Sequence, residues 1–159
     1  MTPLDLALQV GSLYGIAVIS GVFWVVNAET TSAYYVAELG WNPLLVALVC
    51  AAGQGTSYFI LFRSGAWLVL RWGWLHRLVE RTRTKHGERL AKRYMTTSVF
   101  AALIGFPPLA AMAALADGFA VPIYRFLALT VGIRFLRFLG FALVGAELTA
   151  YWHSLWHGG

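Results

Sequence analysis

Residues 126–146 read FLALTVGIRFLRFLGFALVGA, an apolar run that carries two arginines. About 20 apolar residues at about 1.5 Å rise per residue span about 30 Å of hydrocarbon, so this run is long enough to cross a bilayer. Arg134 and Arg137 lie three positions apart and therefore share one side of the predicted helix. The stretch predicts a membrane-embedded helix with one cationic face.

The rest of the 159-residue chain is equally apolar. Hydrophobic residues make up 59% of it and charged residues only 12%, against roughly 25% charged residues in typical soluble proteins. Three further stretches long enough to span a bilayer carry no formal charge, and they cover residues 6–28, 39–62 and 94–116. These features predict an all-α integral membrane protein. They exclude a water-soluble enzyme, a disordered chain and a disulfide scaffold, since Cys50 is the only cysteine.

The first half of the chain divides into two predicted parts. Residues 1–28 form an N-terminal helix, which we expect to be retained because it lacks the basic start of a signal peptide. Residues 29–70 form a first hairpin and a helix. Gly53-Gln54-Gly55 interrupts that helix, and it either permits close packing of a neighbouring helix or marks a broken helix beside a cavity, with the two glycines as hinges.

A basic segment follows, because residues 71–93 contain eight of the twelve Lys and Arg residues. The positive-inside rule places this segment in the cytoplasm, where anionic lipid headgroups are its expected partners. The segment forms either one or two surface helices or a solvated loop that only fixes the topology. No nucleic-acid-binding motif accompanies the charge, so nucleic acid is not an expected partner. If the apolar runs cross alternately, both termini are cytoplasmic.

Residues 94–118 and 119–159 complete a single predicted membrane domain. Pro107 and Pro108 remove two amide donors near the centre of the first of these parts. We therefore expect a broken hairpin with the prolines as its hinge. The final part contains a predicted helix about 46 Å long, which would cross the membrane and protrude from it.

The two arginines of the last helix require a counter-charge, because an arginine at the centre of a membrane helix costs roughly 2.5–3.5 kcal/mol. Glu147 lies about 15 Å along the same helix from Arg137 and cannot reach it. The candidate partners are Glu29, Glu38 and a lipid phosphate; alternatively, both arginines extend to the headgroup region. Glu29 itself either acidifies the first turn of a helix or is a proton- or cation-linked carboxylate in a cavity.

The sequence contains no pattern typical of catalysis or of metal binding. It has no Ser/His/Asp or Cys/His constellation, no HExxH motif and no P-loop. Two of the four histidines lie in the basic segment and two in the C-terminal tail, whereas a transmembrane haem needs imidazoles at membrane depth on facing helices. We therefore expect no enzyme activity, no cofactor and no metal site.

Six short segments between Glu29 and Ala142 carry a family pattern. They are Glu38-Leu39-Gly40-Trp41-Asn42-Pro43, Ala51-Ala52-Gly53-Gln54-Gly55-Thr56-Ser57-Tyr58, Phe62-Arg63-Ser64-Gly65, Phe106-Pro107-Pro108-Leu109, Ala116-Asp117-Gly118 and Ile133-Arg134-Phe135-Leu136-Arg137-Phe138. With Glu29 as the acid at the start of the first hairpin, they resemble the DedA superfamily, also called the SNARE-associated or VTT-domain family, and particularly its short bacterial members. Two departures are Gln54, where the family often has an acid, and the absence of arginines around Phe106.

The resemblance implies a helical bundle with two opposed re-entrant or broken hairpins that meet near mid-membrane, and a basic cytoplasmic loop. It also implies a multi-pass protein of the bacterial inner (plasma) membrane. The implied role is movement of phospholipids or polyprenyl phosphates between leaflets. In this role, Glu29, Gln54 and Arg63 line one side of a cavity, and Arg134 and Arg137 bind phosphate.

The alternative is a non-transporting accessory or structural subunit of a larger membrane complex. The two departures from the family pattern favour this alternative, whereas the paired arginines favour transport. The partners expected for the transporter are membrane lipids and a second copy of the chain. The accessory subunit would instead have a stoichiometric protein partner.

Overall fold

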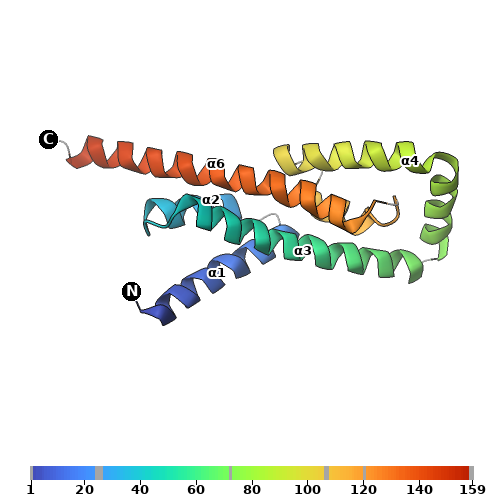
Figure 1. The fold of residues 1–159 in the computed structure, drawn as a ribbon, viewed down its shortest axis with the longest axis horizontal. Helices are drawn as coiled ribbons and strands as arrows, with labels where there is room; N and C mark the ends of the chain where they lie inside the picture. The colour runs from blue at the N-terminus through green and yellow to red at the C-terminus, as the bar shows by residue number, and fades with distance from the viewer. Residues whose placement is uncertain (1, 24–26, 72, 106–107, 120, 158–159) are drawn as a thin grey trace. The chain divides into compact units, whose positions relative to one another are not determined.

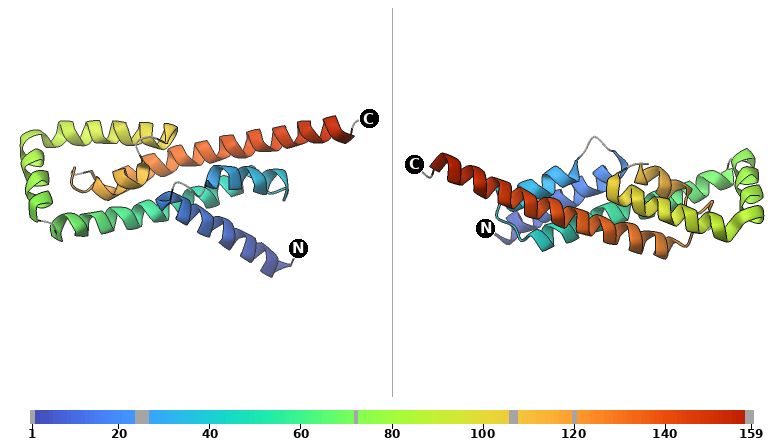
Figure 2. Two further views of the ribbon diagram at one scale, coloured as in Figure 1. Left: turned by 180° about the vertical axis from the view of Figure 1, so that it is seen from behind. Right: turned by 90° about the horizontal axis from the view of Figure 1, so that it is seen from above.

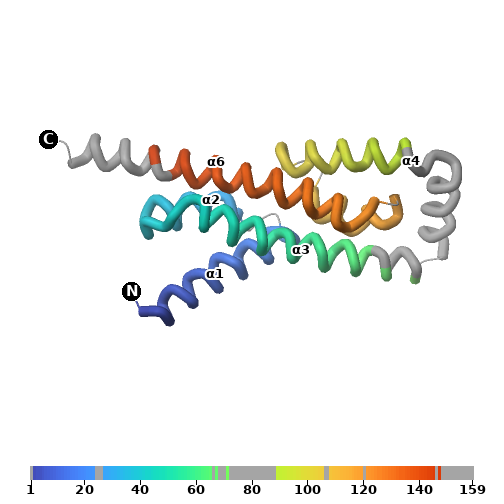
Figure 3. The backbone as a smooth tube through the Cα atoms, viewed as in Figure 1, coloured from blue at the N-terminus to red at the C-terminus, as the bar shows by residue number. Residues whose placement is uncertain are grey.

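The computed structural model of the chain describes residues 2–23, 27–71, 73–105, 108–119 and 121–157. Within these ranges, the backbone alone is described at residues 66, 68–70, 73–88, 146 and 148–157 (Figure 3). The described residues form six α-helices (Figure 1). The helices are α1 (Pro3–Val22), α2 (Ala28–Ala37), α3 (Pro43–Arg71), α4 (Gly73–Ile104), α5 (Leu109–Leu115) and α6 (Ile123–His157).

Three of these helices are long and apolar enough to cross a membrane. Their apolar stretches are Pro3–Val22, Pro43–Gly65 and Ile123–Gly145, of 20, 23 and 23 residues. Large apolar side chains are exposed along all three, and they include Leu4, Leu8, Leu48, Ile60, Leu136 and Val144. Such a surface suits lipid rather than water, because contiguous exposed apolar area is rare on soluble monomers. These helices indicate a multi-pass membrane protein.

The remaining uncharged stretch, residues 94–116, does not form a straight span. α4 ends directly before Gly105, whose φ of +94° favours glycine. The seven-residue α5 then begins after Pro108, which is its N-cap residue. The predicted break in this run is confirmed. Phe106 and Pro107, on which part of that prediction rested, lie outside the described residues.

The described residues of the basic stretch, 71 and 73–93, are helical. Arg71 is the last residue of α3, and α4 begins at Gly73 and continues beyond the basic stretch to Ile104. Of the two structures predicted for this stretch, helix and loop, the backbone has the helix. A single helix carries the chain from the basic residues into the apolar part of α4.

The chain divides into two compact units, each with segments of α3 and α6. The first unit comprises Met1–Gln54 and Arg134–Gly159, and the second comprises Gly55–Ile133. In the first unit, α1 and α2 are neighbours in both views of Figure 2. The second unit contains α4 and α5.

Polar contacts hold α1 against α2 and the start of α3 in the first unit. The hydroxyl oxygens of Ser12 and Tyr35 are 2.7 Å apart, and Tyr35 also donates to the backbone carbonyl of Gln9 over 3.3 Å. The indole Nε1 of Trp41 donates to Gln9 Oε1 over 3.1 Å. Polar side chains in apolar surroundings are stable when they bond to one another. This network places the middle of α1 beside the end of α2.

The glycines in the middle of α3 allow close helix packing. A Cβ atom on Gly53 would lie 2.7 Å from the Cβ of Ala17 in α1, and a Cβ on Gly55 would lie 3.0 Å from Val131 Cγ2 in α6. α3 is continuous through both positions. Of the two alternatives for this segment, the structure has the close-packed helix and not a broken one.

The second unit has an apolar core between α3, α4, α5 and α6. Phe62 and Phe126 face each other in it, with ring centroids 6.2 Å apart. Tyr94 of α4 donates a hydrogen bond to the carbonyl oxygen of Met112 in α5. Other buried members of this core are Tyr58, Ala101, Ala102, Leu109, Ala113, Ala116 and Val121. The core fixes the hairpin of α4 and α5 against the second half of α3.

Candidate functional site

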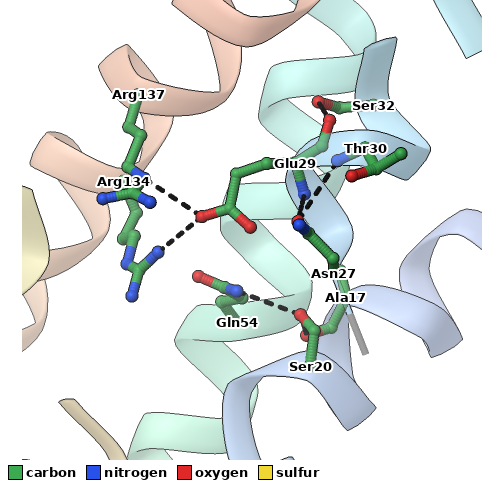
Figure 4. A network of polar contacts seen from close by, with 9 residues as sticks. All are labelled: Ala17, Ser20, Asn27, Glu29, Thr30, Ser32, Gln54, Arg134 and Arg137. Carbon is green, nitrogen blue, oxygen red and sulfur yellow. Dashed lines mark hydrogen bonds and ion pairs between the residues drawn. The ribbon is translucent and has the colours of Figure 1, made fainter. Parts of the chain in front are cut away.

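A charge cluster joins α2 to α6 in the first unit (Figure 4). Arg134 donates from Nη1 to Glu29 Oε1 over 2.9 Å, and Arg137 donates from Nε to the same oxygen over 3.0 Å. The three side chains are 11%, 23% and 14% exposed for Arg134, Arg137 and Glu29. Glu29 is therefore the counter-charge that the sequence requires. Glu38, the other acidic candidate, is instead the exposed C-cap residue of α2.

The cluster lies at the middle of an apolar helix. Arg134 stands midway along Ile123–Gly145, about 16 Å of helix from either end. Gln54 stands midway along the apolar stretch of α3, Pro43–Gly65. Half the hydrocarbon thickness is about 15 Å. If α6 crosses the bilayer, the ion pairs are near its centre and away from both headgroup regions.

The first turn of α2 holds Glu29 in position. Asn27 is the N-cap residue, and its Oδ1 accepts from the backbone amides of Glu29 and Thr30 over 3.0 and 3.2 Å. Ser32 Oγ donates to the carbonyl oxygen of Glu29 over 2.7 Å. The carboxylate of Glu29 also meets the positive end of the helix dipole. Glu29 therefore acidifies the first turn of α2, as one of its two predicted roles requires. The other role, a proton- or cation-linked carboxylate in a cavity, stays a prediction.

The two arginines are not equally satisfied. Arg134 is 9% exposed as a residue, and its Nε is buried without a hydrogen-bond partner among the described residues. The guanidinium of Arg137 lies 5.6 Å from the ring centroid of Phe141, where a cation–π interaction adds to its bond with Glu29. Arg134 therefore retains a donor that is aimed into the protein and lacks an acceptor.

The cluster brings one carboxylate and two guanidinium groups together. A buried donor without an acceptor is costly, and Arg134 Nε is such a donor among the described residues. The arrangement therefore suits one further anionic group that accepts hydrogen bonds from the arginines.

Gln54 is a neighbour of this cluster in the same unit. Its Nε2 donates to Ser20 Oγ over 3.0 Å, and Ser20 in turn donates to the carbonyl of Ala17 over 2.8 Å. Figure 4 shows the amide of Gln54 on the side of the carboxylate of Glu29. Gln54 is only 3% exposed. An uncharged amide thus occupies a buried polar position at the centre of α3.

The other predicted site residues do not belong to the charge cluster. Arg63 belongs to the second unit, where it lines a separate cavity with Ser64 and Trp67. The predicted grouping of Arg63 with Glu29 and Gln54 in one cavity would join residues of both units, and it stays a prediction. Pro108 caps α5, and Pro107 lies outside the described residues.

Metal-binding groups were also sought among the described residues. No group of three or more His, Cys, Asp or Glu side chains there could hold a metal ion. The side chains of all four histidines lie outside that set. The donor set of the charge cluster, with two guanidinium groups, is suited to anions and not to cations.

Comparison with known proteins gives no relative. No protein-family model, curated protein or solved structure matches the chain. The resemblance to the DedA superfamily stays a prediction that rests on the short segments quoted above.

Sequence reasoning missed two features of this site. Ser20 is not among the site residues predicted from the sequence, although it accepts the hydrogen bond from Gln54. A serine inside an apolar run is a signal for such a bond, because its hydroxyl needs a partner. The sharing of one Glu29 oxygen by two arginines carries no sequence signal, since it depends on the position of α2 beside α6.

Proposed function

We propose that the chain is a DedA-like membrane transporter or scramblase that moves phospholipid or polyprenyl-phosphate lipids between leaflets. The observation that carries the proposal is the meeting of Glu29, Arg134 and Arg137 midway along an apolar helix, where Arg134 Nε has no acceptor among the described residues. A lipid phosphate supplies the missing anion. The basic stretch of α4 lies on the cytoplasmic side of the plasma membrane in this proposal.

The chemistry of phosphate fits the cluster. A phosphate presents several acceptor oxygens, and guanidinium groups bind such anions through paired, charge-assisted hydrogen bonds. Glu29 occupies one donor of each arginine, which keeps the empty site from carrying two uncompensated charges. A passing phosphate would compete with Glu29 for these donors, so it would be held only briefly. Weak and reversible binding at mid-membrane is what movement between leaflets requires.

The contacts of α1 and α2 support a re-entrant hairpin. Gln9 contacts Trp41 near the start of α3, whereas Ser20 contacts Gln54 at the middle of the apolar stretch of α3. After this point the chain reverses, and Glu29 contacts the middle of α6. A hairpin that enters the membrane beside the start of α3 and turns near the middle of the membrane explains both contacts. The N-terminus then lies on the side of the membrane where α3 begins.

A re-entrant turn also serves lipid movement. Non-helical backbone at membrane depth needs protein or water around it, because lipid tails cannot satisfy its amides and carbonyls. The short α2 brings the positive end of a helix to the same depth, where it favours an anion. The hairpin therefore supplies a polar environment beside the arginines.

The second candidate function is an accessory subunit without transport activity. Gln54, which replaces an acid of the resembled family, bonds to Ser20 as a structural contact. On α1, Gly11 and Gly15 lie four residues apart, and a Cβ atom at either would meet nothing within 4 Å. Small residues at this spacing let another helix approach closely. In this function the charge cluster only joins α2 to α6.

Fluorescent-lipid scrambling in proteoliposomes tests the proposal. We expect the wild-type protein to accelerate lipid exchange between leaflets, and the Arg134→Gln/Arg137→Gln variant to lose that activity. The variant Glu29→Gln/Arg134→Gln/Arg137→Gln removes every charge of the cluster and controls for an unpaired carboxylate. Arg125→Gln, at an exposed arginine over Tyr124, is the matched control and should retain activity. An inactive wild type, or equal activity in all variants, would contradict the proposal.

A further inference from the structure

The end of the apolar stretch of α3 carries a column of aromatic and cationic side chains. Phe59, Arg63, Trp67 and Arg71 follow one another at intervals of four residues and so share one side of the helix. The guanidinium of Arg63 lies 6.0 Å from the ring centroid of Phe59, and that of Arg71 lies 5.1 Å from the ring centroid of Trp67. Two cations are thus held apart on aromatic faces, about 12 Å from each other along the helix.

The column lies at the boundary of the apolar stretch. This stretch ends at Gly65, between Arg63 and Trp67, while α3 continues to Arg71. Tryptophan and arginine favour this depth because their apolar parts contact lipid tails and their polar ends contact headgroups. Trp67 is 58% exposed, and Arg63 and Arg71 are exposed as well.

A cavity of about 560 Å³ opens beside the column in the second unit. Leu61, Gly65 and Ala114 form its apolar lining, and Arg63, Ser64 and Trp67 complete it. A Cβ on Gly65 would lie 1.8 Å from the carbonyl oxygen of Ala114, so α5 is seated directly on this turn of α3. The cavity therefore has backbone at its floor and the cationic side chain of Arg63 in its lining.

The charge of the column is uncompensated. The salt bridges of the described residues with an acidic partner are those of Glu29 with α6, and none involves Arg63 or Arg71. An exposed guanidinium at this depth binds a phosphate by charge-assisted hydrogen bonds. The neighbouring apolar lining suits the first carbons of an acyl chain. Two unpaired cations favour a lipid with net negative charge over a zwitterionic one.

We propose that the column Phe59–Arg63–Trp67–Arg71 and the adjoining cavity bind an anionic phospholipid, with its phosphate on one of the two arginines and its upper acyl chain against Trp67. This site is distinct from the charge cluster at Glu29, and it does not depend on transport activity. It recruits anionic lipid to the end of α3 from which the basic stretch of α4 continues. The basic stretch adds long-range attraction for the same lipids.

Quenching of Trp67 by lipids with brominated acyl chains tests this site. The protein is placed in nanodiscs that contain brominated phosphatidylglycerol or brominated phosphatidylcholine, and the signal of Trp67 is the difference between the wild type and Trp67→Phe. We expect phosphatidylglycerol to quench this signal at about one tenth of the mole fraction that phosphatidylcholine needs, as expected for one charge-assisted bond.

Matched variants separate the site from general attraction to the surface. In Arg63→Gln/Arg71→Gln, both lipids should quench Trp67 equally. Arg63→Lys/Arg71→Lys should retain part of the preference for phosphatidylglycerol, because it keeps the charge. Arg125→Gln, which removes an arginine held over Tyr124, should retain all of it. Equal quenching by both lipids in the wild type would overturn the proposal. A preference that persists in Arg63→Gln/Arg71→Gln would also overturn it.

Discussion

Replacing Glu29 by glutamine removes the carboxylate that bonds to both Arg134 and Arg137. The glutamine keeps an oxygen near the position of Oε1 but carries no charge. Breaking a buried ion pair by removing one partner costs about 3–5 kcal/mol. Because an acceptor oxygen stays in place and the arginines are 11% and 23% exposed, we expect the lower end of this range, about 3 kcal/mol.

Reversible unfolding in mixed micelles, followed by tryptophan fluorescence, measures this free energy. The control is Glu38→Gln, which removes an exposed acid at the other end of α2 and should change stability by less than about 0.5 kcal/mol. The variant Glu29→Gln/Arg134→Gln/Arg137→Gln should be more stable than Glu29→Gln alone, because no unpaired cation then stays buried.

The same variant distinguishes a structural ion pair from an anion site. In Glu29→Gln both arginines lose the carboxylate that Glu29 supplied, so added anionic phospholipid should restore stability by mass action, about 2.7 kcal/mol at a hundredfold excess over its Kd. The variant without the three charges should gain no stability from the same lipid. A free energy of unfolding for Glu29→Gln within about 0.5 kcal/mol of the wild-type value would show that these ion pairs do not stabilise the fold.

The remaining predictions concern helix contacts. Gly53→Ala should destabilise the protein by about 1–3 kcal/mol, because its Cβ would lie 2.7 Å from that of Ala17. The control is Gly11→Ala, whose Cβ meets open space and which should be neutral or slightly stabilising. Similar unfolding curves for the two variants would contradict this packing. Gly65→Ala should be more harmful than Gly53→Ala, since its Cβ would lie 1.8 Å from the backbone carbonyl of Ala114, which cannot rotate away; a folded, equally stable variant in the same assay would show that α5 does not rest on α3.

Much of the fold follows from composition and length. Apolar runs of sufficient length predicted the three long helices, and the adjacent prolines predicted the break between α4 and α5. Both depend on local chemistry, namely the transfer of side chains from water and the absence of an amide donor. Such effects act wherever the chain is placed, so the sequence is enough to detect them.

The state of the Gly53–Gly55 segment could not be decided in this way. Two glycines beside a glutamine suit a broken helix and a close-packed one equally well. The outcome depends on Ala17 and Val131, which approach from helices remote in sequence, and on Ser20, which bonds to Gln54. With these partners present, α3 keeps its backbone bonds through the segment.

The candidate site was predictable only in part. The cost of burying two arginines required an acid, and this argument reduced the acidic partners to Glu29 and Glu38. It could not choose between them, because the choice depends on which end of α2 lies beside α6. The cap by Asn27 fixes where α2 begins. Likewise, the sequence alone could not place Arg63 in a separate unit.

The central claim is that a lipid phosphate binds the arginines of the charge cluster within the membrane. Solid-state NMR that measures dephasing of arginine side-chain ¹⁵N by lipid ³¹P tests it directly, in proteoliposomes of the wild type and of Glu29→Gln/Arg134→Gln/Arg137→Gln. The account predicts a dephased guanidinium signal in the wild type that the variant lacks, beyond the signal that surface arginines give in both. Identical dephasing in the two proteins would contradict the account and leave the cluster as a structural bond between α2 and α6.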